Sequence, residues 1–215
     1  MDVDCNDSRR MNQAALEMTI FGDRAHPIAL PVSSVDQDHC QRIKGVENVV
    51  RSYTRKCFKP FPKQVIGLLV YGNSKELKKR CDSEAAQAEF SRHSQCATGP
   101  TIEKLHQCMD NFIIDVESVR DTVTDLNLKM PYVCCQTHVF RRCIKRHLTN
   151  QGCPEDSINY VDSLVSGTVE DVIDLTCKGY EFGKGKCQTM PPLTKNGAKQ
   201  SISYLPALVD IYTNL

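Results

Sequence analysis

Twelve cysteines constrain this 215-residue chain more than any other feature of its sequence. Their number is even and they are spread over almost the whole chain, which favours a framework of disulfides. Zinc sites draw their thiolates from short clusters such as C-x2-C, and the sequence contains no such pair. We therefore predict up to six disulfides and no metal site. The cysteines are Cys5, Cys40, Cys57, Cys81, Cys96, Cys108, Cys134, Cys135, Cys143, Cys153, Cys177 and Cys187.

Paired cysteines indicate where the protein works. Disulfides persist in oxidising compartments, so we predict a secreted, extracellular protein; a cytosolic protein with twelve thiols is the alternative. The first five residues are polar and acidic and do not form a secretion signal. We expect that such a signal has been removed or was never included, and that the mature protein starts at about Asp2. Asn6 opens an Asn-Asp-Ser sequon and is the candidate glycosylation site.

Charge and hydropathy exclude two classes of protein. The chain has 27 Lys and Arg against 26 Asp and Glu, a formal net charge of +1, so no overall positive field attracts nucleic acid. No run of about 18 apolar residues is present to span a bilayer. With 40% hydrophobic residues, a chain of this length can bury a sizeable core. We predict a protein without nucleic-acid partners and without integral membrane contact.

Three long stretches repeat apolar residues at steps of three and four, the period of an amphipathic helix. The first is a stripe of about seven turns from Ile102 to Leu126. The second follows Ser33-Ser34 and carries Cys40 to Cys57 on one side, and the third runs from Ile158 to Leu175 behind Pro154. Each is predicted to face the core. The acidic residues on the opposite side of the first stretch are expected in water: Glu103, Asp110, Asp115, Glu117, Asp121 and Asp125.

Shorter stretches complete a helical prediction. Met11 to Phe21 and Tyr132 to Leu148 have helical periodicity, and the run Val65 to Tyr71 is predicted as a buried helix although its length also fits a strand. Glycines and prolines break any regular pattern from Gly179 to Tyr204. Ala207 to Tyr212 forms a short apolar end, which we expect to be loosely docked.

These elements predict an all-α fold, a disulfide-stapled multi-helix bundle with an irregular C-terminal segment. We assign residues 1–187 to a single helical domain and residues 188–215 to an irregular tail with a short terminal helix. Helical phase places Cys135 and Cys143 on one face, while Cys134 points about 100° away. Because adjacent cysteines do not bond each other without strain, Cys134 and Cys135 should tie their helix to two different neighbours.

Charge is unevenly distributed along the chain. The segment from Arg51 to Cys81 is rich in Lys and Arg, and the segment from Glu155 to Asp174 is rich in Asp and Glu. We expect the two segments to form solvated faces that complement each other. The alternative is a basic patch that binds heparin-like polymers or lipid head groups, although aromatic residues do not interleave it as in readers of single-stranded nucleic acid.

One short motif resembles that of an enzyme. Residues Cys134 to His138 read Cys-Cys-Gln-Thr-His, which resembles the C-C-x-x-H-D core of secreted phospholipases A2, whose histidine activates water and whose aspartate binds calcium. Here Val139 follows the histidine, and no glycine-rich loop precedes the motif. A calcium ion would lack oxygen ligands at this position. These departures favour His138 as a helix residue among disulfides.

No complete catalytic motif is present elsewhere. The sequence has no G-x-S-x-G, no H-E-x-x-H and no phosphate-binding glycine loop, and paired cysteines offer no thiolate nucleophile. The histidines form no i, i+4 pair and are expected at the surface or capping helices. They are His26, His39, His93, His106, His138 and His147. We predict that the protein is not an enzyme and has no cofactor.

A motif and the cysteine spacing together resemble a family of secreted proteins. The motif starts Cys57-Phe58-Lys59-Pro60-Phe61-Pro62-Lys63-Gln64-Val65 and leads through Leu68-Leu69-Val70-Tyr71 to Lys78-Lys79-Arg80-Cys81. With the doublet Cys134-Cys135 and Cys143, it resembles secreted cysteine-rich proteins of arthropods, which are similar to the twenty-seven-kilodalton haemolymph glycoprotein group of insects. The resemblance extends from about Cys40 to Cys187. It implies secretion and a helical fold, and it brings no catalytic residues.

These features predict a secreted, non-enzymatic extracellular protein. It would serve as a structural or matrix component, of a silk-type material or of haemolymph, or as a surface-binding module for an extracellular protein partner. An alternative is a carrier whose helices enclose a small hydrophobic ligand. The candidate ligand-binding residues are Phe112, Val116, Val161 and Val165, which would otherwise fill the core. A phospholipase A2-like hydrolase is the remaining alternative.

Overall fold

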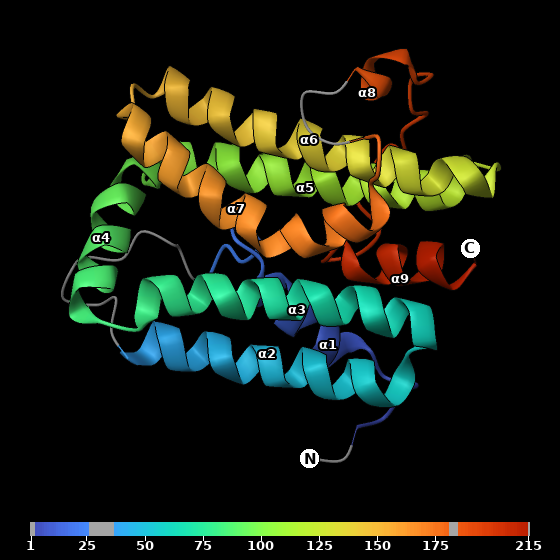
Figure 1. Ribbon diagram of the computed structural model, residues 1–215, viewed down its shortest axis with the longest axis horizontal. Helices are drawn as coiled ribbons and strands as arrows, with labels where there is room; N and C mark the ends of the chain where they lie inside the picture. The colour runs from blue at the N-terminus through green and yellow to red at the C-terminus, as the bar shows by residue number, and fades with distance from the viewer. Residues whose placement is uncertain (1–2, 26–36, 181–184, 215) are drawn as a thin grey trace.

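The computed structural model describes residues 3–25, 37–180 and 185–214. Within these ranges all regular structure is helical, which confirms the all-α, disulfide-stapled bundle. The long helices lie side by side along the longest axis of the molecule, and α4 crosses one end (Figure 1). The helices are α1 (Arg9–Met18), α2 (Gln37–Cys57), α3 (Pro60–Cys81), α4 (Glu84–Ser94), η2 (Gln95–Ala97), α5 (Pro100–Thr122), α6 (Leu126–Asn150), α7 (Glu155–Thr176), α8 (Lys186–Thr189) and α9 (Leu205–Thr213).

Prolines and capping side chains set several helix boundaries. Pro60 and Pro100 occupy the first turns of α3 and α5, where the missing N–H removes no intrahelical hydrogen bond. Asp125 caps α6 by accepting a hydrogen bond from the Asn127 N–H at 2.9 Å. The stripe predicted from Ile102 to Leu126 is therefore wrong at its end, because the helix ends at Thr122 and Leu126, 45% exposed, starts the next one.

Three other helices bear on the predictions. The run Val65 to Tyr71 lies within the 22-residue α3, which confirms the helix. The short α4 was not predicted, because its sequence has a single large apolar residue, Phe90, buried against α7 residue Leu164. The predicted start of the second helix at Ser33-Ser34 lies outside the described residues.

The core consists of two main clusters that share helices α5, α6 and α7. The larger one joins α1, α2, α3 and α9 to them, and the smaller one adds Phe21 and Ala97. Phe112 packs against both clusters. The prediction that the C-terminal end is loosely docked is wrong, because α9 buries Leu205, Ala207, Leu208, Ile211 and Tyr212 in the larger cluster. In contrast, Leu175, predicted to face inward, is 48% exposed at the end of α7.

Helices α3 and α7 lie side by side (Figure 1) and approach closely at two glycines. The backbone of Gly72 faces the carbonyl of Thr168, and Gly167 faces the carboxylate of Glu76. A Cβ atom at Gly72 would collide with this backbone, and one at Gly167 would have to displace the buried Glu76 side chain. Lys75 forms an ion pair of 3.5 Å with Glu170, so the predicted basic and acidic segments do meet. They are not wholly solvated, however.

Two buried charged residues contradict the expectation that the basic and acidic segments form solvated faces. Glu76 is 1% exposed, and its Oε1 accepts a hydrogen bond of 2.7 Å from Lys79. Arg80 is 7% exposed, lies over the Phe90 ring, and has the pKa of its guanidinium lowered by burial. Helical phase turns these two residues of a charged run inward toward α4 and α7, which composition alone does not reveal.

Six disulfides pair all the cysteines. Cys134 bonds Cys177 at the end of α7 and Cys135 bonds Cys187 in α8, which confirms that the doublet ties α6 to two neighbours. The remaining pairs are Cys5–Cys57, Cys40–Cys81, Cys96–Cys153 and Cys108–Cys143. No disulfide joins the segment 5–81 to the segment 96–187.

A strap formed by residues 194–201 covers the acidic side of α5. Glu117 is fully buried and accepts hydrogen bonds from the backbone N–H groups of Gln200 and Ser201, at 2.9 and 2.6 Å. Asp115, 2% exposed, pairs with Lys195 at 2.6 Å. The expectation that these two carboxylates lie in water is wrong, because the strap supplies them with partners. No helix of the described ranges is both long and apolar enough to cross a membrane.

Candidate ligand-binding groove

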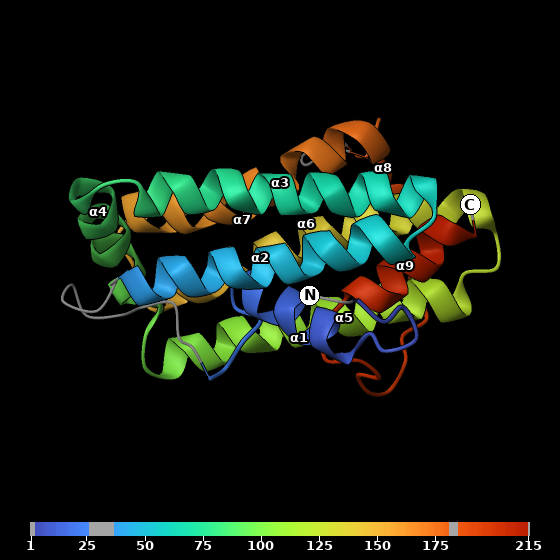
Figure 2. The same ribbon diagram turned by 90° about the horizontal axis from the view of Figure 1, so that it is seen from below.

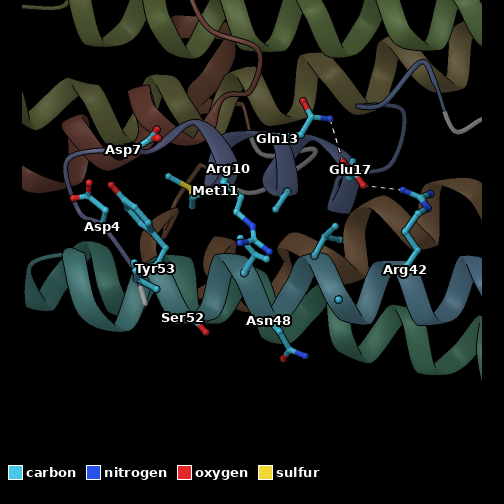
Figure 3. A pocket seen from close by; sticks show the side chains of 15 residues that line it. Asp4, Asp7, Arg10, Met11, Gln13, Glu17, Arg42, Asn48, Ser52 and Tyr53 are labelled. Carbon is cyan, nitrogen blue, oxygen red and sulfur yellow. Dashed lines mark hydrogen bonds and ion pairs between the residues drawn. The ribbon is translucent and has the colours of Figure 1, made fainter. Parts of the chain in front are cut away.

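An open groove of about 870 Å³ lies between α2 and the N-terminal segment with α1 (Figure 3). Figure 2 shows α1 and α2 next to each other on one side of the bundle. The size falls within the range of about 300–1,000 Å³ that ligand-binding pockets typically have. We call it the α1–α2 groove. It is lined by Val3, Asp4, Asp7, Arg10, Met11, Gln13, Ala14, Glu17, Arg42, Gly45, Val46, Asn48, Val49, Ser52 and Tyr53.

Covalent and polar links hold both ends of the groove in place. At one end, the Cys5–Cys57 disulfide fastens the N-terminal segment to the last residue of α2, and the Tyr53 hydroxyl donates a hydrogen bond of 2.9 Å to the Cys5 carbonyl. At the other end, Arg42 pairs with Glu17 at 3.0 Å. The spacing between the two walls is therefore fixed by links outside the groove's centre.

The floor of the groove is apolar and one wall lacks a side chain. Met11 and Ala14 of α1 are buried, and Val46 and Val49 of α2 are partly buried. Gly45 is exposed in the middle of the 21-residue α2, and a Cβ atom added there would meet nothing within 4 Å. A glycine inside a helix costs about 0.5–1 kcal/mol relative to alanine. Here its effect is to leave the groove wide.

Charged groups of both signs stand around the apolar floor. Arg10 extends from α1 across the groove toward α2 (Figure 3), and it forms no hydrogen bond or ion pair with the described residues. Arg9 holds the pKa of Asp7 at about 2 through a hydrogen bond, so the carboxylate at the end of the groove is ionised. The groove thus presents apolar surface beside a cation, Arg10, that has room for an anionic group.

The ligand-binding residues predicted from the sequence lie elsewhere and do not form one site. Phe112 and Val165 line an apolar internal cavity of about 60 Å³ between α3, α5, α6, α7 and α9. Val116 and Val161 are buried in the core and do not line it. This volume is well below the roughly 150 Å³ of an apolar cavity that holds one benzene molecule. The cavity in this conformation is smaller than an aliphatic ligand.

Three histidines expected at the surface or capping helices are buried because they bond polar groups of neighbouring segments. His138, 7% exposed, has its Nε2 2.7 Å from the Tyr180 carbonyl. His106 Nδ1 lies 2.8 Å from the carbonyl of Phe21, and His93 Nδ1 lies 3.0 Å from the Ser157 hydroxyl. The motif at Cys134 to His138 therefore places two disulfides around a histidine that faces main-chain oxygen.

Two further groups of residues have the composition of a metal site or a modification site. Cys108, Cys143 and His147 have side-chain ligand atoms within 4.8 Å of one another, but the two sulfurs form a disulfide and neither is the thiolate that a metal binds. Asn6 is exposed, and its backbone N–H donates a hydrogen bond of 2.9 Å to Asp4. A glycan at Asn6 would stand beside the end of the α1–α2 groove.

The sequence prediction missed the groove, although one signal was available. An isolated glycine within a helical pattern often has a packing or functional reason, and Gly45 interrupts the second predicted helix. The contribution of the N-terminal segment depends on the Cys5–Cys57 pairing, which spacing does not determine.

The fold and the groove define the class of disulfide-stapled, all-helical proteins with an open surface groove. Comparison of the chain with protein-family models, curated proteins and solved structures gives no match. The resemblance to arthropod haemolymph proteins therefore stays a prediction.

Proposed function

We propose that this protein is a secreted, non-enzymatic extracellular binding module, and that the α1–α2 groove is its binding surface for a partner protein. The groove, about 870 Å³ in volume with an apolar floor, is the observation that carries this proposal. Six disulfides support an extracellular location, since such bonds persist in oxidising compartments. The resemblance of the cysteine spacing to secreted arthropod proteins, predicted from the sequence, agrees with this location.

The chemistry of the groove describes the partner. Apolar side chains would pack on Met11, Ala14 and Val49, in the way that a peptide segment lies in a groove between helices. A carboxylate on the partner would pair with Arg10, which has no other partner among the described residues. The expected ligand is therefore a peptide segment with apolar residues and at least one acidic residue.

A bulky residue at Gly45 tests the proposal. Gly45→Trp fills the groove without a steric clash, because the space around the position is open. The matched control is Gly67→Trp in α3, where an added Cβ also meets nothing within 4 Å and which does not line the groove. Peptides are selected from a displayed random library on the wild-type protein, and their dissociation constants are measured for all three proteins.

The dissociation constants show whether the peptides bind in the α1–α2 groove or elsewhere on the surface. Acidic, apolar peptides that bind the wild type and Gly67→Trp equally, and lose at least about tenfold in affinity for Gly45→Trp, support the proposal. Peptides that bind Gly45→Trp as well as the wild type contradict it, as does a library that yields no binder.

A separate assay tests the proposal that the protein is not an enzyme. A phospholipase-like activity would require calcium-dependent ester hydrolysis that His138→Gln abolishes. We expect no such hydrolysis from the wild-type protein with calcium and mixed phospholipid vesicles, because Val139 stands where calcium needs an aspartate. Product formation that the His138→Gln variant loses would overturn the non-enzymatic part of the proposal.

A further inference from the structure

A second groove, of about 480 Å³, lies between α5 and α6 and shares no residue with the α1–α2 groove. Helices α2 and α6 lie at opposite edges of the bundle in Figure 1. We call this hollow the α5–α6 groove. It is lined by Cys108, Asn111, Phe112, Asp115, Val139, Phe140, Arg142, Cys143, Arg146 and Lys195.

The rim of the α5–α6 groove carries an excess of positive charge. Arg142 and Arg146 are exposed one helical turn apart on α6, and neither has an ion pair or hydrogen bond among the described residues. Lys195 neutralises Asp115, the groove's single carboxylate. Close by, the pKa of His147 is lowered by burial and then by the charges of Arg146 and Lys104. Two guanidinium groups are therefore available to an anion.

The floor of the same groove is apolar. Val139 is 38% exposed, and the Cys108–Cys143 disulfide lies beside it. The rings of Phe112 and Phe140 stack with their centroids 5.2 Å apart. Both rings also line the internal cavity of about 60 Å³, so they form a wall between the groove and the apolar interior.

We propose that the α5–α6 groove binds an anionic amphiphile, with its head group on Arg142 and Arg146 and its aliphatic chain on Val139, Phe140 and Phe112. Guanidinium groups bind carboxylate, sulfate and phosphate oxygens through paired hydrogen bonds. The chain gains by leaving water against aromatic and aliphatic surface. The small hydrophobic ligand predicted from the sequence would thus bind in the α5–α6 groove and carry a negative head group. This proposal does not depend on the α1–α2 groove.

Head-group charge is the first test. The wild-type protein is titrated in a calorimeter with decanoate, decyl sulfate and decyltrimethylammonium below their critical micelle concentrations, and with decanol below its solubility limit. We expect saturable binding of one decanoate or one decyl sulfate per chain. Decanol and decyltrimethylammonium should bind at least about tenfold more weakly, because decanol has no negative charge to pair with the two arginines and decyltrimethylammonium is itself a cation. Equal binding of all four ligands would overturn the proposal.

Surface variants locate the site. Arg142→Gln with Arg146→Gln should weaken decanoate binding about tenfold or more, and Val139→Asp should weaken it similarly by placing a carboxylate on the floor. Arg55→Gln with Lys63→Gln, two exposed cations of α2 and α3, is the charge-matched control and should bind like the wild type.

All three altered side chains of the groove are exposed, so the fold is retained, which the thermal unfolding of each variant verifies. Decanoate binding that these variants leave unchanged would refute the site, and binding lost equally in the control would show attraction by net charge alone.

Decanoate binding to the Gly45→Trp variant distinguishes the two grooves. Gly45→Trp blocks the α1–α2 groove and should leave decanoate binding unchanged, since Gly45 is not part of the α5–α6 groove. Loss of decanoate binding in Gly45→Trp would place the amphiphile in the α1–α2 groove and contradict the inference. The proposal that this groove binds peptides is tested separately, by the peptide affinities of Gly45→Trp and Gly67→Trp.

Discussion

Gly45 and Gly72 both interrupt long helices, but their surroundings differ. Gly45 faces the open α1–α2 groove, and Gly72 touches the Thr168 carbonyl where α3 meets α7. Gly45→Ala should stabilise the protein by about 0.5–1 kcal/mol, because alanine restricts the unfolded chain and fits the helix. Gly72→Ala should destabilise it by about 1–3 kcal/mol by forcing the two helices apart. Denaturant unfolding of the two variants, each with m-values compared to the wild type, measures the effects. Equal shifts of the same sign would contradict this assignment.

The ion pair of Asp121 with Arg120 predicts that the free energy of unfolding depends on pH. A hydrogen bond from Arg120, 2.6 Å long, holds the pKa of Asp121 at about 2. Because the folded pKa lies below that of the unfolded chain, about 3.9, the contribution to stability is complete above about pH 4 and is lost as the pH falls toward 2. Partial exposure reduces it to about 1 kcal/mol.

Asp121→Asn should therefore lower the free energy of unfolding by about 1 kcal/mol at pH 7, and the difference from the wild type should vanish near pH 2. Asp174→Asn, an exposed carboxylate of α7, is the control and should show no such convergence. The measurement is denaturant unfolding at a series of pH values. A difference that persists at pH 2 would mean that packing, not charge, is responsible.

At the scale of elements, the strap depends on Glu117. Its carboxylate is the acceptor for two backbone N–H groups of the strap and is fully buried. Glu117→Ala leaves both donors without their charged acceptor, at a cost of about 2–4 kcal/mol. We expect trypsin to cut the variant faster at Lys195 and Lys199, which lie in the strap. Glu89→Ala, an exposed position of α4, should be cut like the wild type. Mass spectrometry of the digests identifies the sites, and unchanged cleavage at the strap would contradict its dependence on Glu117.

Most elements could be predicted from the sequence, and the exceptions have physical causes. The stripe of Leu105, Met109 and Val116 defines a helix because its period is 3.6 residues. The opposite, acidic face misled the prediction, since periodicity does not show that a distant strap donates hydrogen bonds to Glu117. The candidate site was missed for a related reason, because the α1–α2 groove depends on a disulfide between distant residues. Local patterns predict elements better than the contacts between them.

For the whole molecule, the disulfides predict a defined pattern of fragments. Cys5 to Cys81 contain two disulfides, Cys96 to Cys187 contain four, and none links the two segments. A protease site inserted between Asp82 and Ser83, both exposed, should give two bands on a denaturing gel without reductant. The fragments should stay together in native gel filtration, because α3 packs against α7. A single band on the denaturing gel would reveal a disulfide across this boundary.

Thiol labelling tests the complete pairing. With all twelve cysteines oxidised, iodoacetamide should add nothing to the native protein and twelve adducts after reduction in denaturant. Each disulfide closes a loop of 35 to 57 residues, which corresponds to about 4 kcal/mol of stabilisation in the loop-entropy model. Intact-mass spectrometry counts the adducts. Native labelling would contradict the framework and remove the main support for an extracellular location.

The separation of the disulfides into two groups also bears on how the chain oxidises as it is made. Twelve cysteines allow on the order of ten thousand complete pairings, whereas four cysteines allow about 3 and eight allow about 105. If the first four pair among themselves before the others emerge, the combined choice falls to about 300. Synthesis from the N-terminus would thus reduce the number of possible cysteine pairings about thirtyfold. The full-length reduced chain, when it refolds, has all of these pairings open to it.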